Sequence, residues 1–409
     1  MQPNKRVLFI SFDYPPSKSV AGQRTLRMTQ YLPEFGWQPL VLTAKNSAYE
    51  GLDESQEIPK HMYEHIYRTG ALDVDRHLSI NGKHLGWMKA IDRWSTWIPG
   101  AIIKGINIIK KYEPEVIVAT YPTMSAHIVG NILAKITRTP LVLDYQDPYA
   151  YIHKNNVDAL KKKISYKVEK SAIKRAHSLI FVTEQAMSAY RRFHCLPENL
   201  LCTVIENGYD ESNFTKLDLM PNTSLFNKSK YSLYYSGVLY PDGRDPTPLF
   251  NALSLLKKNG IIAPSNFELV FQGSGNGSRF RNLIAELQIN EMVKFEKSVS
   301  FLESLKNMMA ADALCLIQDA VFKLQIPGKL YEYIRAKKPI LVCAPTNTAT
   351  AYEAQVIPYA QIGYSKDEIA ECIIEMIGKS NIADLDITHF SRKSKARKLA
   401  THLTEVLHG

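Results

Sequence analysis

No hydrophobic run in this 409-residue sequence is long enough to cross a membrane, since a spanning helix needs about 20 apolar residues. The apolar run VLFISF, which follows Lys5 and Arg6, lacks a small-residue cleavage site. We therefore expect it to be a first β-strand rather than a signal peptide. With 45% hydrophobic and 22% charged residues, the composition is typical of a soluble globular protein.

Closely spaced cysteine pairs are also missing. The five cysteines are scattered and no Cys-x-x-Cys occurs, so neither a zinc site nor a disulfide framework is predicted. Such cysteine usage fits a reducing cytoplasm. No nucleic-acid-binding module and no surface of interleaved aromatic and basic residues is recognisable. The formal net charge of +10 still indicates an anionic partner, for example anionic lipid or a phosphorylated small molecule.

The chain alternates strands and helices twice, which predicts an α/β fold with two Rossmann-like domains of parallel, doubly wound sheets. The length also favours two domains. Strands are expected at residues 7–12, 38–44, 116–122, 140–147 and 178–184, and again at 231–237, 267–273, 293–298, 313–317 and 339–343. The predicted division is a first domain (1–205), a polar hinge (206–230), a second domain (231–385) and a final helix (386–409).

Ligands of such sheets bind beyond the carboxyl ends of the strands, so the loops that follow strands are the candidate sites. After the first strand, SVAGQRT offers Gly22 for close backbone approach and Arg24 for a bidentate phosphate contact. An ordinary glycine-containing loop would look the same. Later loops place Gly237 and Arg244, and then Gly273 and Gly275, after strands. For Arg244 the alternative is a surface arginine in a turn. For Gly273 and Gly275 it is a flexible turn.

Lys329 and Glu332 begin a predicted helix after the turn Ile-Pro-Gly. A helix N-terminus attracts anions, and a lysine in the first turn is unfavourable unless an anion is bound. Glu332 could accept hydrogen bonds from the two hydroxyls of a ribose. Together they could hold a nucleoside diphosphate. Alternatively, they form an exposed ion pair that contributes little.

Two polar stretches follow strands of the first half. TYPTMSAHIV contains His127, and LDYQDPY contains Asp144 and Asp147. These side chains could meet a substrate hydroxyl, or His127 could be a packed histidine and the carboxylates could cap the next segment. The basic stretch 160–175 (LKKKISYKVEKSAIKR) could lie on an anionic membrane, with Leu160, Ile164 and Val168 on one side. It could equally be a helix packed on the first sheet.

Taken together, several motifs in this order resemble one family: PPSKSVAGQRT, TYPTMSAHIVG, PLVLDYQDPY, ENGYDESNF, SGVLYPDGRDP, LVFQGSG and IPGKLYEYIRAKKPILV. The chain resembles the retaining glycosyltransferases of the GT-B fold that are related to sucrose synthase and the phosphatidylinositol mannosyltransferases (glycosyltransferase family 4-like). It is most similar to the bacterial enzymes that build surface polysaccharide. The resemblance runs through nearly the whole chain.

The resemblance implies two Rossmann-like domains facing across a cleft, a nucleotide-diphospho-sugar donor such as a UDP- or GDP-sugar, and no metal or other cofactor. Gly22 resembles the glycine against the donor phosphates, Arg244 stands where the family has a diphosphate-binding lysine, and Glu332 resembles the ribose-binding glutamate.

Three places depart from the family pattern. Leu324 replaces the first glutamate of the E-x7-E motif, and Val238 replaces a phosphate-binding arginine. Gln146 and Asp147 stand where the family often has a histidine.

The predicted catalytic residues are Asp147, His127 and Lys329, and the predicted donor-binding residues are Gly22, Arg24, Gly237, Arg244, Gly273, Gly275, Lys329 and Glu332. We expect transfer of a sugar to a glycan or lipid-linked acceptor, with retention, in bacterial surface polysaccharide or lipopolysaccharide synthesis. The expected location is the cytoplasm, peripherally on the inner face of the cytoplasmic membrane. The alternatives are a GT-B UDP-sugar epimerase and a non-catalytic nucleotide-sugar-binding protein.

Overall fold

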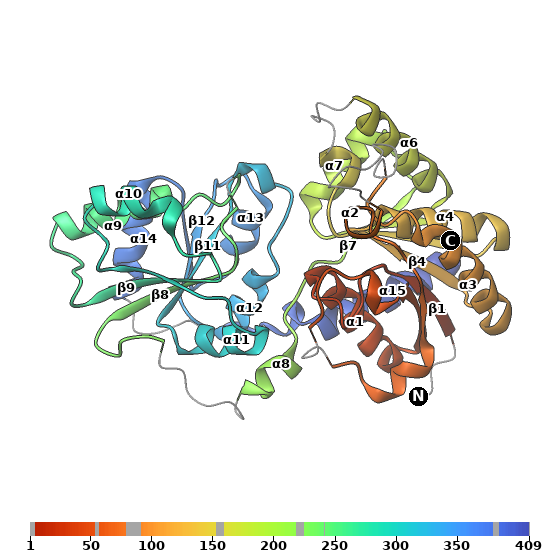
Figure 1. Cartoon of the computed structure of the whole chain (residues 1–409), viewed down its shortest axis with the longest axis horizontal. Helices are drawn as coiled ribbons and strands as arrows, with labels where there is room; N and C mark the ends of the chain where they lie inside the picture. Colours follow the sequence, from red (N-terminus) through yellow and green to blue (C-terminus); the bar gives the residue numbers. More distant parts are fainter. Residues whose placement is uncertain are drawn as a thin grey trace. The chain divides into compact units, whose positions relative to one another are not determined.

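Each half of the chain forms one fully parallel β-sheet in the computed structural model (Figure 1). The structure describes residues 5–53, 57–78, 91–152, 159–217, 225–240, 242–378 and 384–408. The chain divides into two units, unit 1 (Met1–Asn207 with Arg392–Gly409) and unit 2 (Gly208–Ser391). None of the helices in this described part of the chain is both long and apolar enough to span a membrane.

Unit 1 contains a seven-stranded sheet with the order β3-β2-β1-β4-β5-β6-β7. Its central strands are runs of buried, mostly branched residues that need both faces covered by helices. The strands are β1 (Lys5–Ile10), β2 (Trp37–Ala44), β3 (Ile66–Thr69), β4 (Val116–Thr120), β5 (Leu141–Tyr145), β6 (Ser178–Phe181) and β7 (Leu201–Val204). The helices are α1 (Val20–Tyr31), α2 (Val74–His77), α3 (Trp97–Tyr112), α4 (Met124–Thr137), α5 (Tyr149–Ile152), α6 (Ala159–Arg175), α7 (Glu184–His194) and α15 (Arg392–His408).

Helices cover both faces of the unit 1 sheet. One face packs against α1 and α15 through a core that includes Leu26 and Leu399. On the other face α4 lies tightly on the sheet, because a Cβ built at Gly130 would come within 2.7 Å of the Ala119 Cβ. The α15 helix thus completes the core of unit 1 although it comes from the end of the chain.

Unit 2 contains a six-stranded sheet with the order β10-β9-β8-β11-β12-β13. One face packs on α9, α10 and α14, and the other on α11, α12 and α13. The strands are β8 (Tyr231–Ser236), β9 (Phe267–Gln272), β10 (Val293–Glu296), β11 (Ala313–Ile317), β12 (Ile340–Cys343) and β13 (Ala360–Gly363). The helices are α8 (Glu211–Thr215), α9 (Thr247–Lys258), α10 (Arg281–Glu286), α11 (Phe301–Ala310), α12 (Lys329–Ala336), α13 (Ala349–Gln355) and α14 (Lys366–Gly378).

The predicted α/β class with two parallel sheets is confirmed. The predicted hinge is placed differently, because unit 2 begins at Gly208 and buries Tyr209, Phe214 and Leu217 in its core. The Tyr209 N–H donates to the Phe390 carbonyl, so the segment entering unit 2 is held beside the segment leaving it. The start of the polar stretch is therefore part of unit 2, and residues 218–224 lie outside the described residues.

Candidate functional site

The order of strands in unit 2 reverses between β8 and β11. In open parallel sheets this switch point leaves a crevice at the carboxyl ends of the two central strands, where ligands bind. Gly237 follows β8 directly, and α12 is the helix that follows β11. The residues that the sequence singles out in unit 2 therefore gather at the place where the topology predicts a ligand.

Lys329, the first residue of α12, turns its side chain towards the end of β8. Its ammonium donates a hydrogen bond to the Ser236 carbonyl and lies 4.4 Å from the centre of the Tyr235 ring. Gly237 has a left-handed backbone (φ 117°), and a Cβ there would come within 2.7 Å of Lys329 Nζ. Gly237 thus provides the room in which the ammonium sits. The ammonium of Lys329 is therefore engaged at the end of β8 rather than in an exposed ion pair with Glu332.

The ammonium of Lys329 lies in an environment that disfavours its charge. Burial, followed by the positive charge of Arg244, lowers the pKa of this lysine to about 7, while Glu332 acts in the opposite direction. Two cations therefore act on each other at the carboxyl edge of the sheet. An anion bound between them would relieve both the burial cost and the mutual repulsion.

Two aromatic rings lie against the guanidinium of Arg244. Its guanidinium lies 4.7 Å from the centre of the Tyr240 ring and 5.8 Å from that of Phe322. One N–H donates to the Val238 carbonyl at 3.2 Å, and Arg244 is partly exposed. The adjacent Val238 side chain, which replaces the arginine of the family pattern, is half-exposed and brings no charge to this loop.

The glycine-rich loop after β9 lies against the loop after β8. The Ser274 hydroxyl donates to the Gly237 carbonyl at 2.6 Å, and a Cβ at Gly273 would lie 3.9 Å from Gly237 Cα. Both Gly273 and Gly275 are left-handed (φ 75° and 80°), and a Cβ at Gly275 would meet open space. These two loops give unit 2 a surface on which a ligand can approach the backbone closely.

In unit 1 the candidate residues are less open to a ligand. Gly22 lies in the first turn of α1, and a Cβ there would make ordinary contacts of 3.5 Å with the backbone of Asp13 and Tyr14. An alanine would fit at this position, so the local backbone does not require glycine. The role of Gly22 in binding donor phosphates stays a prediction.

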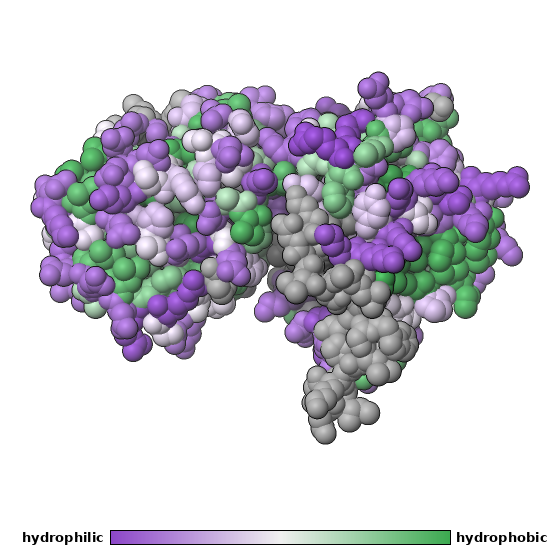
Figure 2. Space-filling view, turned by 90° about the horizontal axis from the view of Figure 1, so that it is seen from above, coloured by the Kyte–Doolittle hydropathy of each residue, from purple (hydrophilic) through white to green (hydrophobic). Residues whose placement is uncertain are grey.

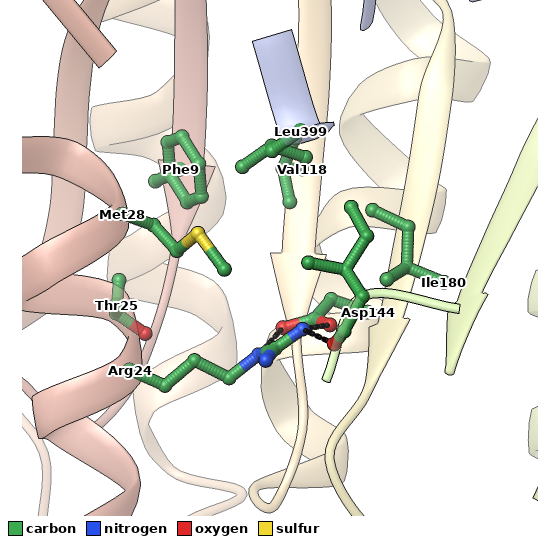
Figure 3. A pocket seen from close by; sticks show the side chains of 9 residues that line it. Phe9, Arg24, Thr25, Met28, Val118, Asp144, Ile180 and Leu399 are labelled. Carbon is green, nitrogen blue, oxygen red and sulfur yellow. Dashed lines mark hydrogen bonds and ion pairs between the residues drawn. The ribbon is translucent and has the colours of Figure 1, made fainter. Parts of the chain in front are cut away.

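Arg24 is buried and fully engaged inside unit 1 (Figure 3). Its guanidinium donates to both carboxylate oxygens of Asp144, at 3.0 and 3.2 Å, and to three further oxygens, from Ile205, Glu206 and Asn207. All five N–H donors are used. The structure therefore assigns Arg24 a structural role in place of the predicted phosphate contact.

The space beside this ion pair is too small for a sugar or a phosphate. The enclosed cavity has a volume of about 10 Å³, and apolar side chains such as Phe9, Met28 and Leu399 line most of it (Figure 3). Such a volume holds at most one water molecule. The cavity is part of the core of unit 1.

We expect Arg24→Met to lower the free energy of unfolding by about 3–5 kcal/mol, since it leaves the buried Asp144 without its cation. Urea unfolding measures this loss. The double variant Arg24→Met/Asp144→Leu should recover most of it, because both charges are then removed. A single variant that unfolds like the wild type but binds the donor weakly would instead restore the predicted phosphate role of Arg24.

His127 is completely buried on α4. It lies edge-on to Tyr145 with 4.8 Å between ring centres, and its Nε2 is 3.4 Å from the Asp144 carbonyl oxygen. Burial lowers its pKa to about 4, so the ring is neutral at physiological pH. This is the packed histidine that the sequence also allowed, and the predicted contact of His127 with a substrate is not possible in this conformation.

Asp144 and Asp147 differ in accessibility. Asp144 is buried with Arg24 and also accepts a hydrogen bond from the Thr120 hydroxyl at 2.8 Å. Asp147 lies in the loop after β5 and is partly exposed. Of the two carboxylates, Asp147 is therefore the one that a substrate can reach, and its catalytic role stays a prediction.

Two Asp-x-Asp triplets, Asp73–Asp75 and Asp384–Asp386, could suggest metal ligands. Asp73 caps α2, and both members of the first triplet lie within 4 Å of Arg93. Asp384 pairs with Lys337, and Asp386 accepts from the Thr388 N–H. Within the described ranges, no cluster of three or more His, Cys, Asp or Glu side chains could hold a metal ion.

Sequence reasoning did not single out the groups that hold Lys329. Tyr235 and the Ser236 carbonyl contact its ammonium, and Ser274 fixes the loop of Gly237. Tyr235 and Ser236 directly precede Gly237 in the sequence. Their role depends on the tertiary approach of α12, however, so no local pattern could have identified them.

Residues 21–208, which make up most of unit 1, match the family model of the Glycosyl transferase 4-like domain. A comparison with curated protein sequences gave no match. Among solved structures, the lipopolysaccharide outer core galactosyltransferase WaaB in its apo form is 11% identical, with a TM-score of 0.61, over 98% of this chain and 99% of that one.

Two further structures are similar over the whole chain. HepE of Anabaena in complex with UDP is 16% identical, with a TM-score of 0.60, covering 99% of this chain and 97% of that one. UDP-GlcNAc 2-epimerase of Methanocaldococcus jannaschii is 12% identical, with a TM-score of 0.56, covering 98% and 99%. At such low identity these likenesses establish the fold alone.

The fold and the family match together define the class. Residues 21–208 of unit 1 match the glycosyl transferase 4-like family, and the whole chain has the GT-B fold. The predicted fold is confirmed, and the family match supports the predicted glycosyltransferase class.

Proposed function

We propose that this glycosyltransferase uses a nucleotide-diphospho-sugar as donor, UDP- or GDP-linked, and holds it at the carboxyl edge of the unit 2 sheet. The observation that carries the proposal is the arrangement of Lys329 and Arg244 beside the open glycine loops at the switch point. A bound diphosphate would offset the burial and the repulsion by Arg244 that lower the pKa of Lys329. The binding of UDP by HepE, which has the same fold, agrees with this donor class.

Each candidate residue at the carboxyl edge of the unit 2 sheet has a distinct role in donor binding. Lys329 and Arg244 neutralise the diphosphate, and Gly237, Gly273 and Gly275 allow the phosphates and base to approach the backbone. Glu332, one turn into α12 and partly buried, accepts hydrogen bonds from the ribose hydroxyls. Leu324 carries no charge, so the contact that the missing glutamate would make with the transferred sugar must come from another group.

The chemistry requires negative charge to be stabilised as the bond from the anomeric carbon to the diphosphate breaks. The ammonium of Lys329 is positioned before the reaction by Tyr235 and Ser236, which makes it suited to this purpose. We propose that transfer proceeds with retention and that the departing phosphate oxygen accepts the proton of the acceptor hydroxyl. Asp147, the reachable carboxylate of unit 1, would position the acceptor. No metal is part of this proposal.

The proposed acceptor is a growing glycan or a lipid-linked sugar, in the synthesis of bacterial surface polysaccharide or glycoconjugate at the inner face of the cytoplasmic membrane. The likeness to a lipopolysaccharide galactosyltransferase favours this setting over metabolism of free sugars. A UDP-sugar epimerase is the second candidate, because an epimerase shares the fold. The family match of unit 1 favours transfer.

A thermal-shift experiment tests the donor. UDP or GDP, and one of their sugars, should raise the unfolding temperature, since a ligand that binds only the folded state stabilises it by about 2.7 kcal/mol at a hundredfold excess over Kd.

EDTA should change neither the thermal shift nor the transfer rate. Loss of activity on chelation, with recovery on adding manganese, would contradict the metal-free proposal. Product of inverted sugar configuration in an NMR assay would contradict retention, and a product that remains nucleotide-linked would favour the epimerase.

A further inference from the structure

Three helices of unit 1 form a continuous surface. Helix α3 packs beside α4, and α4 packs beside α6. The contact between α3 and α4 is close, because a Cβ at Gly105 would lie 2.4 Å from the Leu133 side chain. We call the outer surface of these helices the α3–α4–α6 face.

The charge on this face has one sign. The helices carry three lysines on α3, one on α4, and six lysines with one arginine on α6. Their single carboxylate, Glu169, is buried and accepts hydrogen bonds from Tyr190 and His194, at 2.8 Å each. The formal net charge of the three helices is therefore +10, which equals the formal net charge of the whole chain. The exposed members are Lys110, Lys111, Lys135, Lys162, Lys163, Lys167, Lys170, Lys174 and Arg175.

The same face exposes branched apolar side chains. Ile103 on α3 and Ile136 on α4 are 65% and 57% exposed, among the most exposed large apolar residues in the described part of the chain. Figure 2 shows a continuous hydrophobic area at the right-hand end of the molecule, where Figure 1 places α3 and α4. Partly exposed isoleucines extend the ridge, namely Ile102, Ile106, Ile128 and Ile132.

Helix α6 contributes charge more than apolar contact. The sequence predicted a stripe of Leu160, Ile164 and Val168 towards the membrane, but α6 turns Ser165, Glu169 and Ala172 inwards against unit 1. Val168 packs on the cluster around Met124 and Tyr149. The side chains of Leu160 and Lys161 lie outside the description. Helix α6 thus packs against α4 and α5 of unit 1 and presents a basic outer surface, and its contact with a membrane stays a prediction.

We propose that the α3–α4–α6 face docks on an anionic lipid bilayer, with the isoleucine ridge entering the interface and the surrounding lysines contacting lipid phosphates. A ridge of isoleucines flanked by lysines, on helices whose one carboxylate is buried, has the pattern of an element that lies in a membrane interface. Anionic lipid complements the charge, and acyl chains accept the isoleucines. The inference extends the proposed function by giving the enzyme a location for a lipid-linked acceptor, but its test does not depend on the donor.

Flotation of the full-length protein with phospholipid vesicles tests the proposal. The protein should float with vesicles that contain phosphatidylglycerol, should not float with phosphatidylcholine alone, and should be released by high salt. Ile103→Ser/Ile136→Ser should weaken binding roughly tenfold or more, because two exposed apolar side chains no longer enter the interface. Lys167→Gln/Lys174→Gln should weaken it roughly fivefold for each charge removed.

A matched control is Ile261→Ser/Ile374→Ser, which removes two comparably exposed isoleucines from unit 2 (41% and 43% exposed) and should leave binding unchanged. The thermal shift with UDP should persist in every variant, which separates failure of docking from failure of the donor site. The proposal is overturned if wild type and Ile103→Ser/Ile136→Ser bind vesicles equally, or if wild type binds none. It is also overturned if the isoleucine variant abolishes a dimer seen by light scattering, because a second copy then covers the face.

Discussion

Lys329→Ala should lower turnover by roughly 10²–10³-fold, the loss expected when one preorganised charge that stabilises a leaving group is removed. The ammonium is already placed by the Tyr235 ring and the Ser236 carbonyl, so no other group can move into its position without reorganisation. The substitution should not destabilise the fold. Burial lowers the pKa of Lys329, which means that the unliganded folded state disfavours its charge.

The control for this prediction is Lys338→Ala, which removes the same charge just beyond the far end of α12. It should leave transfer kinetics at the wild-type level. Steady-state kinetics of both variants with the correct donor, together with their unfolding temperatures, make the comparison. Wild-type turnover in Lys329→Ala would show that the lysine at the edge of unit 2 is only part of the packing.

Donor affinity should depend on pH through the same residue. The pKa of Lys329 in the folded protein is about 7, and binding of a diphosphate should raise this pKa because the anion stabilises the ammonium. Binding therefore takes up a proton above pH 7. Affinity should be constant just below pH 7 and should fall by up to about tenfold for each pH unit above it, until the pKa of the complex is reached.

Titration of a nucleotide sugar at several pH values measures this slope, because its diphosphate diester keeps its two charges throughout. In Lys329→Ala the affinity should be weak and independent of pH over the same range. His127 cannot produce the effect, since burial lowers its pKa to about 4. A wild-type affinity that does not change between pH 7 and 9 would mean that Lys329 is not the group that meets the diphosphate.

The buried strands of both sheets could be predicted because each is a short, branched apolar run bounded by turns. The run that predicted a strand at 231–237, for example, forms β8 over Tyr231–Ser236. Strands β3, β7 and β13 were missed. They have four residues each and lie at sheet edges, where half-exposed side chains such as Tyr67 leave no apolar run in the sequence. Edge strands are specified by their neighbour more than by their own pattern.

The candidate site was predictable where a glycine follows a strand directly, as for Gly237, and where a charge begins a helix, as for Lys329. It was not predictable where the partner of a polar residue lies far away in the chain. Arg24 and Asp144 are 120 residues apart, and only the fold shows that they form a buried ion pair. The same holds for His127, whose environment is made by the strand that carries Tyr145.

Calorimetric titration of UDP and of inorganic pyrophosphate into the wild type, Lys329→Ala and Glu332→Gln tests the central claim most directly, that the edge of unit 2 holds the diphosphate and ribose of the donor. Lys329→Ala should weaken both ligands by roughly tenfold or more, because a charged contact is lost. Glu332→Gln should weaken UDP to a similar extent but leave pyrophosphate, which has no ribose, unchanged. Wild-type affinity for UDP in both variants would contradict the account.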